Sequence, residues 1–302
     1  MNHCSSMIKK PFFMKSASHT PIIILFFIFF IYLLSVSIVC AEDLALINRP
    51  VNASGLTGLL FTTAPYTVPP GTLETGASIF SENSVRPDYT ITEYPFSVTL
   101  GLSENSELAL RSSYVTVSEG PTGTAVIKRK TGDIELAYKW DFLPQHESSM
   151  RPAVALIVAG SVPAEDNADL KISAVSHWGM RLGLATGSEI SWRDHTLGIY
   201  VDGQIAGQDL TENRLMDLYG IFNGGLIFPI SKYQNLQMFI EYSLVSGKDK
   251  ITINGGDYTA LTYGLRLVSE RFNLTIGAQS LRKKIEGYDS SGRVIGLLSM
   301  KF

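Results

Sequence analysis

Apolar and polar residues alternate one by one through most of the chain after Thr72. In GDIELAYKWDF, residues 132–142, Ile134, Leu136, Tyr138, Trp140 and Phe142 occupy alternate positions, and mostly polar residues fill the positions between them. Successive side chains of a β-strand point to opposite faces, whereas the 3.6-residue period of a helix would mix the two sets. The pattern therefore predicts strands with one apolar and one polar face.

Twelve segments share this pattern, and residues typical of turns separate them. They lie near residues 72–81, 88–101, 106–118, 132–143, 151–162, 176–187, 194–206, 214–229, 235–246, 257–268, 271–281 and 293–302. Many hold about ten alternating residues, the length that a tilted strand needs to cross a bilayer. An even number fits a single-chain bacterial barrel. We predict an all-β fold, a transmembrane antiparallel up-and-down β-barrel of about 12 strands over residues 71–302.

The connections between these segments differ in length by parity. Those after odd-numbered segments, such as PAEDNADLKIS and GKDKITINGG, are mostly long and charged, whereas those after even-numbered segments, such as LSEN and SER, are mostly short. Outer-membrane barrels have short periplasmic turns and longer external loops. A soluble β-sandwich explains each strand taken alone, but it gives no reason for this parity.

The two faces of the predicted strands suit a barrel in lipid. The expected lipid face carries Leu156, Val158, Leu182, Leu184, Ile199, Val201, Met238, Ile240, Leu265, Leu274, Ile276 and Leu298. Aromatic residues near strand ends form the expected interfacial girdles: Tyr138, Trp140, Phe142, Trp178, Tyr242, Phe272 and Phe302. The opposite face carries charged and small residues. Six of its charges are the candidate lumen-lining residues: Arg111, Glu135, Lys139, Arg181, Glu241 and Arg266.

The N-terminal region precedes the first predicted strand and divides in two. Lysines within residues 9–15 precede an apolar run at 21–39, and residues 39–41, Val-Cys-Ala, suit signal peptidase. This pattern predicts a signal peptide over residues 1–41, and a retained inner-membrane anchor is the alternative because the run is long. Residues 42–70 are rich in Pro, Gly and Thr. We expect an irregular lead-in that either crosses the lumen or lies at the periplasmic mouth.

Composition adds constraints on stability and on partners. Both cysteines, Cys4 and Cys40, lie in the predicted signal, so disulfides cannot stabilise the exported chain. Removing the three signal lysines leaves 22 basic and 28 acidic residues, a net charge of −6. No basic face suggests nucleic-acid binding. Basic clusters at residues 127–130, 248–250 and 282–284 fall in the predicted external loops and suit lipopolysaccharide phosphates, although solvated loop charge is the simpler explanation.

Two stretches resemble known outer-membrane proteins. The last ten residues, RVIGLLSMKF, alternate and end on Phe302, similar to the C-terminal signature that the barrel insertion machinery reads. Three motifs, GLSENSEL at 101–108, GDIELAYK at 132–139 and RPAVALIVAGSVPAED at 151–166, resemble the outer-membrane transporters of the MetA-pathway-of-phenol-degradation family. Ala164-Glu165 replaces the Thr-Gly of that family's third motif. The resemblance implies a barrel that passes small or hydrophobic solutes.

These observations lead to a functional hypothesis. We expect a bacterial outer-membrane barrel that forms a narrow channel for passive passage of small or hydrophobic solutes. A structural or surface-interaction barrel is the alternative, in which the lumen charges make satisfied cross-strand pairs. An outer-membrane hydrolase is a third class, but His146, His177 and His195 form no recognisable triad. We expect no catalytic residues, no cofactor and no metal, because no ligand cluster or phosphate-binding glycine loop occurs.

Overall fold

The computed structural model describes residues 47, 49–85, 88–119, 125–145, 151–164, 178–192, 195–208, 217–230, 235–247, 257–283 and 291–302. The predicted signal peptide, residues 1–41, lies outside the described residues. Residues Val39–Phe302 form one compact unit. No helix within the described ranges is long and apolar enough to cross a membrane.

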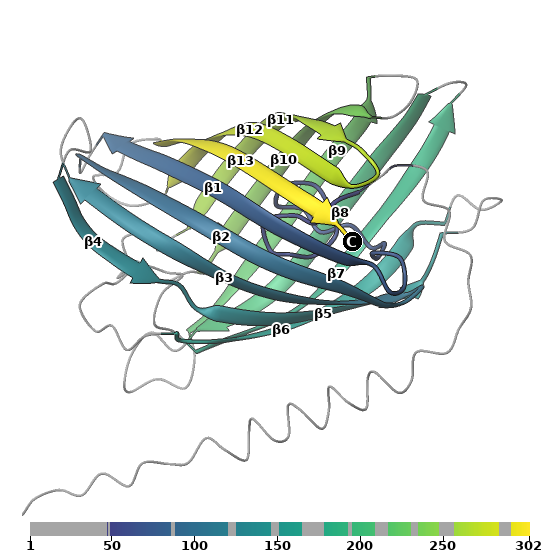
Figure 1. Cartoon of the computed structure of the whole chain (residues 1–302), viewed down its shortest axis with the longest axis horizontal. Helices are drawn as coiled ribbons and strands as arrows, with labels where there is room; N and C mark the ends of the chain where they lie inside the picture. Colours follow the sequence, from purple (N-terminus) through teal and green to yellow (C-terminus); the bar gives the residue numbers. More distant parts are fainter. Residues whose placement is uncertain are drawn as a thin grey trace, which may run out of the picture. The chain divides into compact units, whose positions relative to one another are not determined.

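Antiparallel strands make up nearly all of this unit and close on themselves (Figure 1). Neighbours in sequence pair with each other except the fourth and fifth strands, which both pair with the third, and the first strand also pairs with the last. The strands are β1 (Leu73–Val85), β2 (Asp88–Ser103), β3 (Ser106–Glu119), β4 (Ala125–Thr131), β5 (Ile134–Leu143), β6 (Ala153–Val162), β7 (Gly179–Trp192), β8 (His195–Gln208), β9 (Asp217–Pro229), β10 (Leu236–Ser246), β11 (Tyr258–Val268), β12 (Phe272–Lys283) and β13 (Ser291–Lys301). Closure leaves no free edge between β1 and β13.

One position in the barrel is shared by two strands. β3 pairs with β5 along Ser106–Arg111 and with β4 along Tyr114–Glu119, so β4 and β5 together act as one of 12 strands. Residues 125–131, which the sequence pattern predicts to lie in a connection, form β4, so that prediction is wrong. They form a strand because β3 extends beyond the reach of β5 and its remaining backbone groups pair with β4. The predicted 12-stranded barrel is confirmed.

The two ends of the barrel differ. β1 begins where β13 ends, and the backbone N–H groups of Leu73 and Phe302 donate to each other's carbonyls at 3.2 and 2.8 Å. We call this the terminal end and the opposite one the loop end. The strand ends that flank residues 163–178, 209–216, 247–257 and 284–290 lie at the loop end, and those that flank 104–105, 144–152, 193–194, 230–235 and 269–271 lie at the terminal end. The predicted parity largely holds, with two exceptions: the connection at 86–87 is short because β1 continues to Val85, and nine residues, 144–152, separate β5 from β6 at the terminal end.

The outer surface is apolar, as the alternation predicts. Large exposed side chains include Leu182, Leu184, Ile199, Met238, Ile240, Leu265, Leu274, Ile276 and Leu298. Leu156, Val158 and Val201 are half-buried on the same face, and Tyr138 is buried. A continuous exposed apolar surface of this kind is unstable in water and suits lipid.

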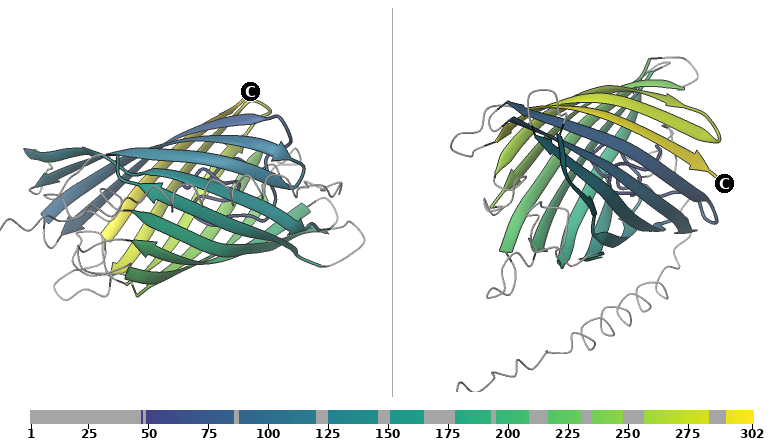
Figure 2. Two further views of the ribbon diagram at one scale, coloured as in Figure 1. Left: turned by 90° about the horizontal axis from the view of Figure 1, so that it is seen from below. Right: turned by 60° about the vertical axis from the view of Figure 1, so that its left-hand side comes forward.

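Residues 49–70, which we call the lumenal segment, lie inside the ring of strands (Figures 1 and 2). Two isolated bridges, Val51 with Thr57 and Gly58 with Thr63, fold the segment back on itself. The turn between Val51 and Thr57 uses Gly55, which has a φ of 83° and donates its N–H to the carbonyl of Asn52 at 3.0 Å. A Cβ at Gly55 would lie 3.0 Å from Cβ of Ser97, so glycine suits both this backbone conformation and the close wall.

Candidate functional site: the barrel lumen

Apolar side chains of the lumenal segment form a core inside the barrel. Leu59, Leu60 and Tyr66 belong to a buried cluster that includes the wall residues Tyr200 and Phe239. Leu56 belongs to a second cluster, with the wall residues Ala109, Ala137, Ile157, Ala159 and Ala185. Burying one leucine contributes roughly 1.5–3 kcal/mol. The segment therefore packs against the wall as a protein core does, rather than resting loosely in the bore.

Glycines in the wall make room for these side chains. A Cβ built at Gly225 of β9 would overlap Cδ1 of Leu59, and one at Gly277 of β12 would lie 3.3 Å from Cδ2 of Leu60. At Gly76 of β1 the added Cβ would lie 3.2 Å from Cγ2 of Val51. The inward side chains at these positions are absent, so the wall alone leaves the bore unfilled and the segment occupies that volume.

Glu241 of β10 binds the tip of the lumenal segment. Its carboxylate accepts three backbone N–H groups, from Leu60 at 3.2 Å, Phe61 at 3.0 Å and Thr62 at 2.7 Å. The side chain of Glu241 is 1% exposed. Three converging N–H groups replace the water that a buried carboxylate loses. Glu241 thus fixes the turn at residues 59–62 to the wall.

A buried ion pair holds the two limbs of the segment together. Nζ of Lys139 on β5 lies 2.9 Å from Oε1 of Glu107 on β3 and also donates to the carbonyls of Ala64 and Tyr66 at 3.0 and 2.5 Å. Glu107 accepts the N–H groups of Thr57 and Val68, both at 2.8 Å. Both charged side chains are fully buried. Opposite charges from adjacent strands therefore bind the backbone of the segment at two separate points along it.

Four more wall residues contact the segment. Glu189 of β7 pairs with Arg49 at 3.0 Å and accepts the N–H of Ile47 at 2.9 Å. The remaining contacts come from three other strands: Glu74 Oε1 with the N–H of Val51 at 3.2 Å, Asp202 Oδ2 with the N–H of Thr63 at 2.8 Å, and Arg266 Nη1 with the carbonyl of Gly58 at 3.2 Å. The carboxylates of the wall accept backbone N–H groups of the segment, and the guanidinium of Arg266 donates to a backbone carbonyl. Each wall charge therefore binds a backbone group of the opposite partial charge.

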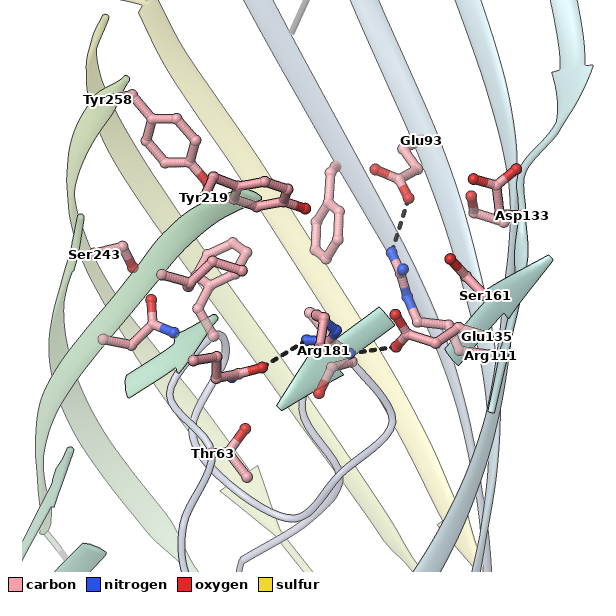
Figure 3. A pocket seen from close by; sticks show the side chains of 18 of the residues that line it. Thr63, Glu93, Arg111, Asp133, Glu135, Ser161, Arg181, Tyr219, Ser243 and Tyr258 are labelled. Carbon is pink, nitrogen blue, oxygen red and sulfur yellow. Dashed lines mark hydrogen bonds and ion pairs between the residues drawn. The ribbon is translucent and has the colours of Figure 1, made fainter. Parts of the chain in front are cut away.

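The loop-end half of the lumen contains a cavity of about 280 Å³ (Figure 3). Its floor includes Phe61 and Thr63 of the lumenal segment. Two ion pairs line it: Arg111 Nη2 lies 2.9 Å from Oε1 of Glu93, and Arg181 pairs with Glu135. These side chains are between 14% and 22% exposed, whereas Lys139 and Glu107, which bind the segment, are fully buried.

The six candidate residues of the sequence analysis thus fall into two groups. Lys139, Glu241 and Arg266 contact the lumenal segment, and Arg111, Glu135 and Arg181 line the cavity. That any of them borders a permeation path stays a prediction.

Sequence reasoning missed Glu93, Glu107 and Glu189 as candidates. Strand alternation carried the signal for all three, because each shares its parity with inward residues of its strand, as Glu107 does with Ala109 and Arg111.

The described residues offer no support for a metal centre, since they contain no group of three or more His, Cys, Asp or Glu side chains that could hold an ion. His146 and His177, two of the three histidines weighed for a hydrolase, lie outside the described residues. His195 is the first residue of β8 and pairs through its backbone with Trp192.

Comparison with known proteins identifies the fold. No protein-family model matches the chain, and no curated protein matches its sequence. An outer-membrane channel from Pseudomonas putida F1 matches with a TM-score of 0.58 and 11% identity, over 79% of this chain and 98% of that one. LpxR from Salmonella typhimurium matches with a TM-score of 0.52 and 10% identity, over 76% of this chain and 99% of that one. At such low identities the similarity establishes the architecture alone, and the chain has the fold of outer-membrane β-barrels.

Proposed function

We propose that this protein is an outer-membrane channel for small solutes whose bore is closed by the lumenal segment, residues 49–70. The proposal rests on one observation: the inward side chains of the wall are too small to fill the bore. Glycines and alanines face the lumen where the segment lies, so the side chains of the wall do not fill it. Side chains of the strands fill the interior of a barrel of about eight strands, and a 12-stranded barrel is wider, so another part of the chain has to fill its bore if it is to be closed. Here the filling is a separate, removable piece of chain.

The attachment of the segment is compatible with release. Its contacts with the wall are hydrogen bonds, ion pairs and apolar packing, and its covalent link to β1 is the turn at Pro69–Gly71. Gly71 has a φ of 74°, and a Cβ built there meets nothing within 4 Å. Movement about this turn would carry the segment out through the terminal end without breaking any pairing between strands.

Placement in the outer membrane is supported by the apolar outer surface and by the fold shared with the Pseudomonas putida channel. The signal peptide expected at residues 1–41 provides a route of export. With the terminal end in the periplasm, the longer connections face lipopolysaccharide outside. The resemblance to the phenol-degradation transporters supports passage of small solutes, and we propose that lipid, lipopolysaccharide and the insertion machinery are the partners of the barrel.

Conductance in planar lipid bilayers tests the proposal. We would compare refolded residues 42–302 with a variant that lacks residues 49–70, and verify folding of both by heat-modifiable migration on gels. The proposal predicts rare openings for the first protein and continuous conductance for the second. A folded, inserted variant that conducts no current would contradict the proposal, because the wall alone would then block the bore.

A structural barrel remains the second candidate, and one observation favours it. Seven charged wall residues from seven strands contact the segment, which makes it a well-anchored part of the fold. In that case the segment stabilises the barrel and never leaves. The two candidates differ in the protein containing residues 42–302: a channel opens at some voltage or solute condition, whereas a structural barrel never does.

A further inference from the structure

The cavity in the loop-end half of the lumen has the features of a binding site. Its volume of about 280 Å³ lies close to the lower end of small-molecule sites, roughly 300–1,000 Å³. Aromatic rings line one side, with Tyr219 and Tyr258 close to each other (Figure 3). The paired side chains of Arg111 and Glu93 lie across the cavity from them. A ring-shaped ligand could pack its C–H groups on the aromatic side while its polar groups reach the other side.

Charges around the cavity are balanced. Among the described lining residues, the acidic ones are Glu93, Asp133 and Glu135, and the basic ones are Arg111, Arg181 and Arg293. Each of the three arginines forms an ion pair with a carboxylate. Arg293 pairs at 2.7 Å with Glu82, which lies behind the lining and also pairs with Lys283 at 2.6 Å, so Glu82 and Lys283 together add no net charge. A site with no net charge gives no electrostatic gain to an anion or a cation, yet either would lose hydration on entering. The cavity therefore favours a neutral ligand.

Several polar atoms of the lining lack a partner within the described part of the chain. They are Nε of Arg111, Nε of Arg181, Oγ of Ser243 and Oε1 of Gln279. Two are donors, one is an acceptor, and the hydroxyl is both. Buried polar atoms without a partner are costly. A small shift of these side chains would turn the four atoms toward the cavity, where the hydroxyl groups of a ligand, which both donate and accept, could satisfy them.

The floor of the cavity joins it to the closed half of the lumen. Asp202 accepts the N–H of Thr63 from below, and its other oxygen accepts the side-chain amides of Gln204 and Asn223, which line the cavity, at 2.8 and 3.0 Å. The ring of Phe61 of the lumenal segment lies tilted against that of Phe80, with 5.9 Å between ring centroids. The amides of the floor are thus held in fixed orientations, as a binding site requires.

From these four features we infer that the cavity binds a neutral polyhydroxylated solute, of the size of one or two sugar rings. Aromatic rings contact its C–H faces, and the paired arginines, carboxylates and amides bind its hydroxyls. Binding of the solute requires only the cavity and does not require transport through the barrel. The further step, that the bound sugar is also the solute that permeates, rests on the proposed function.

Isothermal titration calorimetry on refolded residues 42–302 in detergent tests binding without transport. The probes are maltose and glucose, then glucuronate and glucosamine, which add one charge of either sign to glucose, and cyclohexanol, which keeps a ring but has one hydroxyl. We expect a neutral sugar to bind at least tenfold more tightly than any of the last three. Absence of detectable sugar binding, or equal binding of cyclohexanol, would overturn the inference.

Charge variants make the test independent of simple loss of folding. Glu135→Gln leaves the lining with one excess positive charge, and we expect it to raise affinity for glucuronate relative to glucosamine about tenfold. Arg181→Met leaves an excess negative charge and should shift the preference the opposite way. Arg282→Met, at an exposed position of β12, is the matched control and should change neither. Folded variants in which the affinities for glucuronate and glucosamine change by the same factor would exclude this cavity as the binding site.

Sugar binding without any bilayer conductance would support the binding site and contradict the proposed channel. Conductance without sugar binding would support the channel and contradict the binding site.

Discussion

In the terminal half of the lumen, wall charges bind the backbone of the lumenal segment, whereas in the loop half they bind one another. Glu241 illustrates the first arrangement, with three backbone N–H groups on one carboxylate. Arg181 and Glu135, which pair around the cavity, illustrate the second. Three strands carry inward charges of both kinds: β3 with Glu107 and Arg111, β5 with Lys139 and Glu135, and β7 with Glu189 and Arg181. An inward charge in this barrel can therefore either bind the lumenal segment or border an open volume, depending on whether the segment reaches it.

Burial explains why the two arrangements should differ in energy. Lys139 and Glu107 are fully buried, and each would be strongly destabilised if its partner were removed. Arg111 and Glu93 keep about a fifth of their side-chain surface exposed, so water can replace a lost partner. Substitutions in the terminal half should therefore open the bore, and those in the loop half should leave it closed.

The largest effect is expected for Lys139→Met. The substitution leaves the carboxylate of Glu107 charged and unpaired beneath the segment, which costs about 3–5 kcal/mol in the closed state. Water reaches Glu107 once the segment leaves, so we expect a channel that stays open in bilayer recordings. The double variant Lys139→Met with Glu107→Gln removes both charges and should restore much of the closure. A double variant as open as the single one would mean that the buried charge is not the cause.

A slightly smaller effect is expected for Glu241→Ala. It leaves the N–H groups of Leu60, Phe61 and Thr62 without their acceptor, at a cost of about 3 kcal/mol, roughly a hundredfold in the ratio of closed to open channels. Single-channel open probability measures this ratio directly. Glu93→Ala serves as the control, because the carboxylate that it removes pairs with Arg111 beside the cavity. Equal open probability in both variants would contradict the difference between the two halves.

Gly225→Val should open the bore by steric means. A Cβ at this position overlaps Leu59, and overpacking of this kind costs typically 1–3 kcal/mol. The adjacent Gly224 is the matched control, because a Cβ there meets no atom closer than 3.9 Å. Both variants place valine in β9, so a difference in conductance comes from the close inward contacts at position 225, which are with Leu59, Glu241 and Thr62. Valine at 224 and at 225 giving the same open probability would refute the packing argument.

The smallest effect on closure is expected for Arg111→Met. Its ion pair with Glu93 is partly exposed, and such pairs contribute about 1 kcal/mol or less. Open probability should stay near that of the unmodified protein, while open channels should become more cation-selective because a positive charge has been removed. Reversal potentials in a salt gradient measure this selectivity. An increase in open probability as large as that of Glu241→Ala would show that the ion pairs of the cavity also keep the lumenal segment in place.

The strand pattern of the barrel was predictable because alternation is local. Leu182, Leu184 and Ile276 lie outward and Lys139, Glu241 and Arg266 lie inward, as their positions in the strands require. The division at β4 and β5 was not predictable, because it depends on how far β3 extends beyond its neighbour.

The contacts of the lumenal segment were not predictable either. The segment has no periodic pattern, and its contacts span long separations, such as 181 residues between Leu60 and Glu241. Sequence alternation identifies Lys139 and Arg181 as inward charges of the same kind. It contains no information on which of them the segment will contact.

A reversible tether of the lumenal segment is the most direct test of its role as the closure. A Cβ at Gly76 lies 3.2 Å from Cγ2 of Val51, close enough for a disulfide between Val51→Cys and Gly76→Cys. Residues 42–302 contain no other cysteine, and the tether would hold the segment at both of its ends. In the Glu241→Ala background, oxidation should abolish the openings and a reducing agent should restore them. Conductance that is the same in the oxidised and reduced protein would contradict the account, because the current would then bypass the segment.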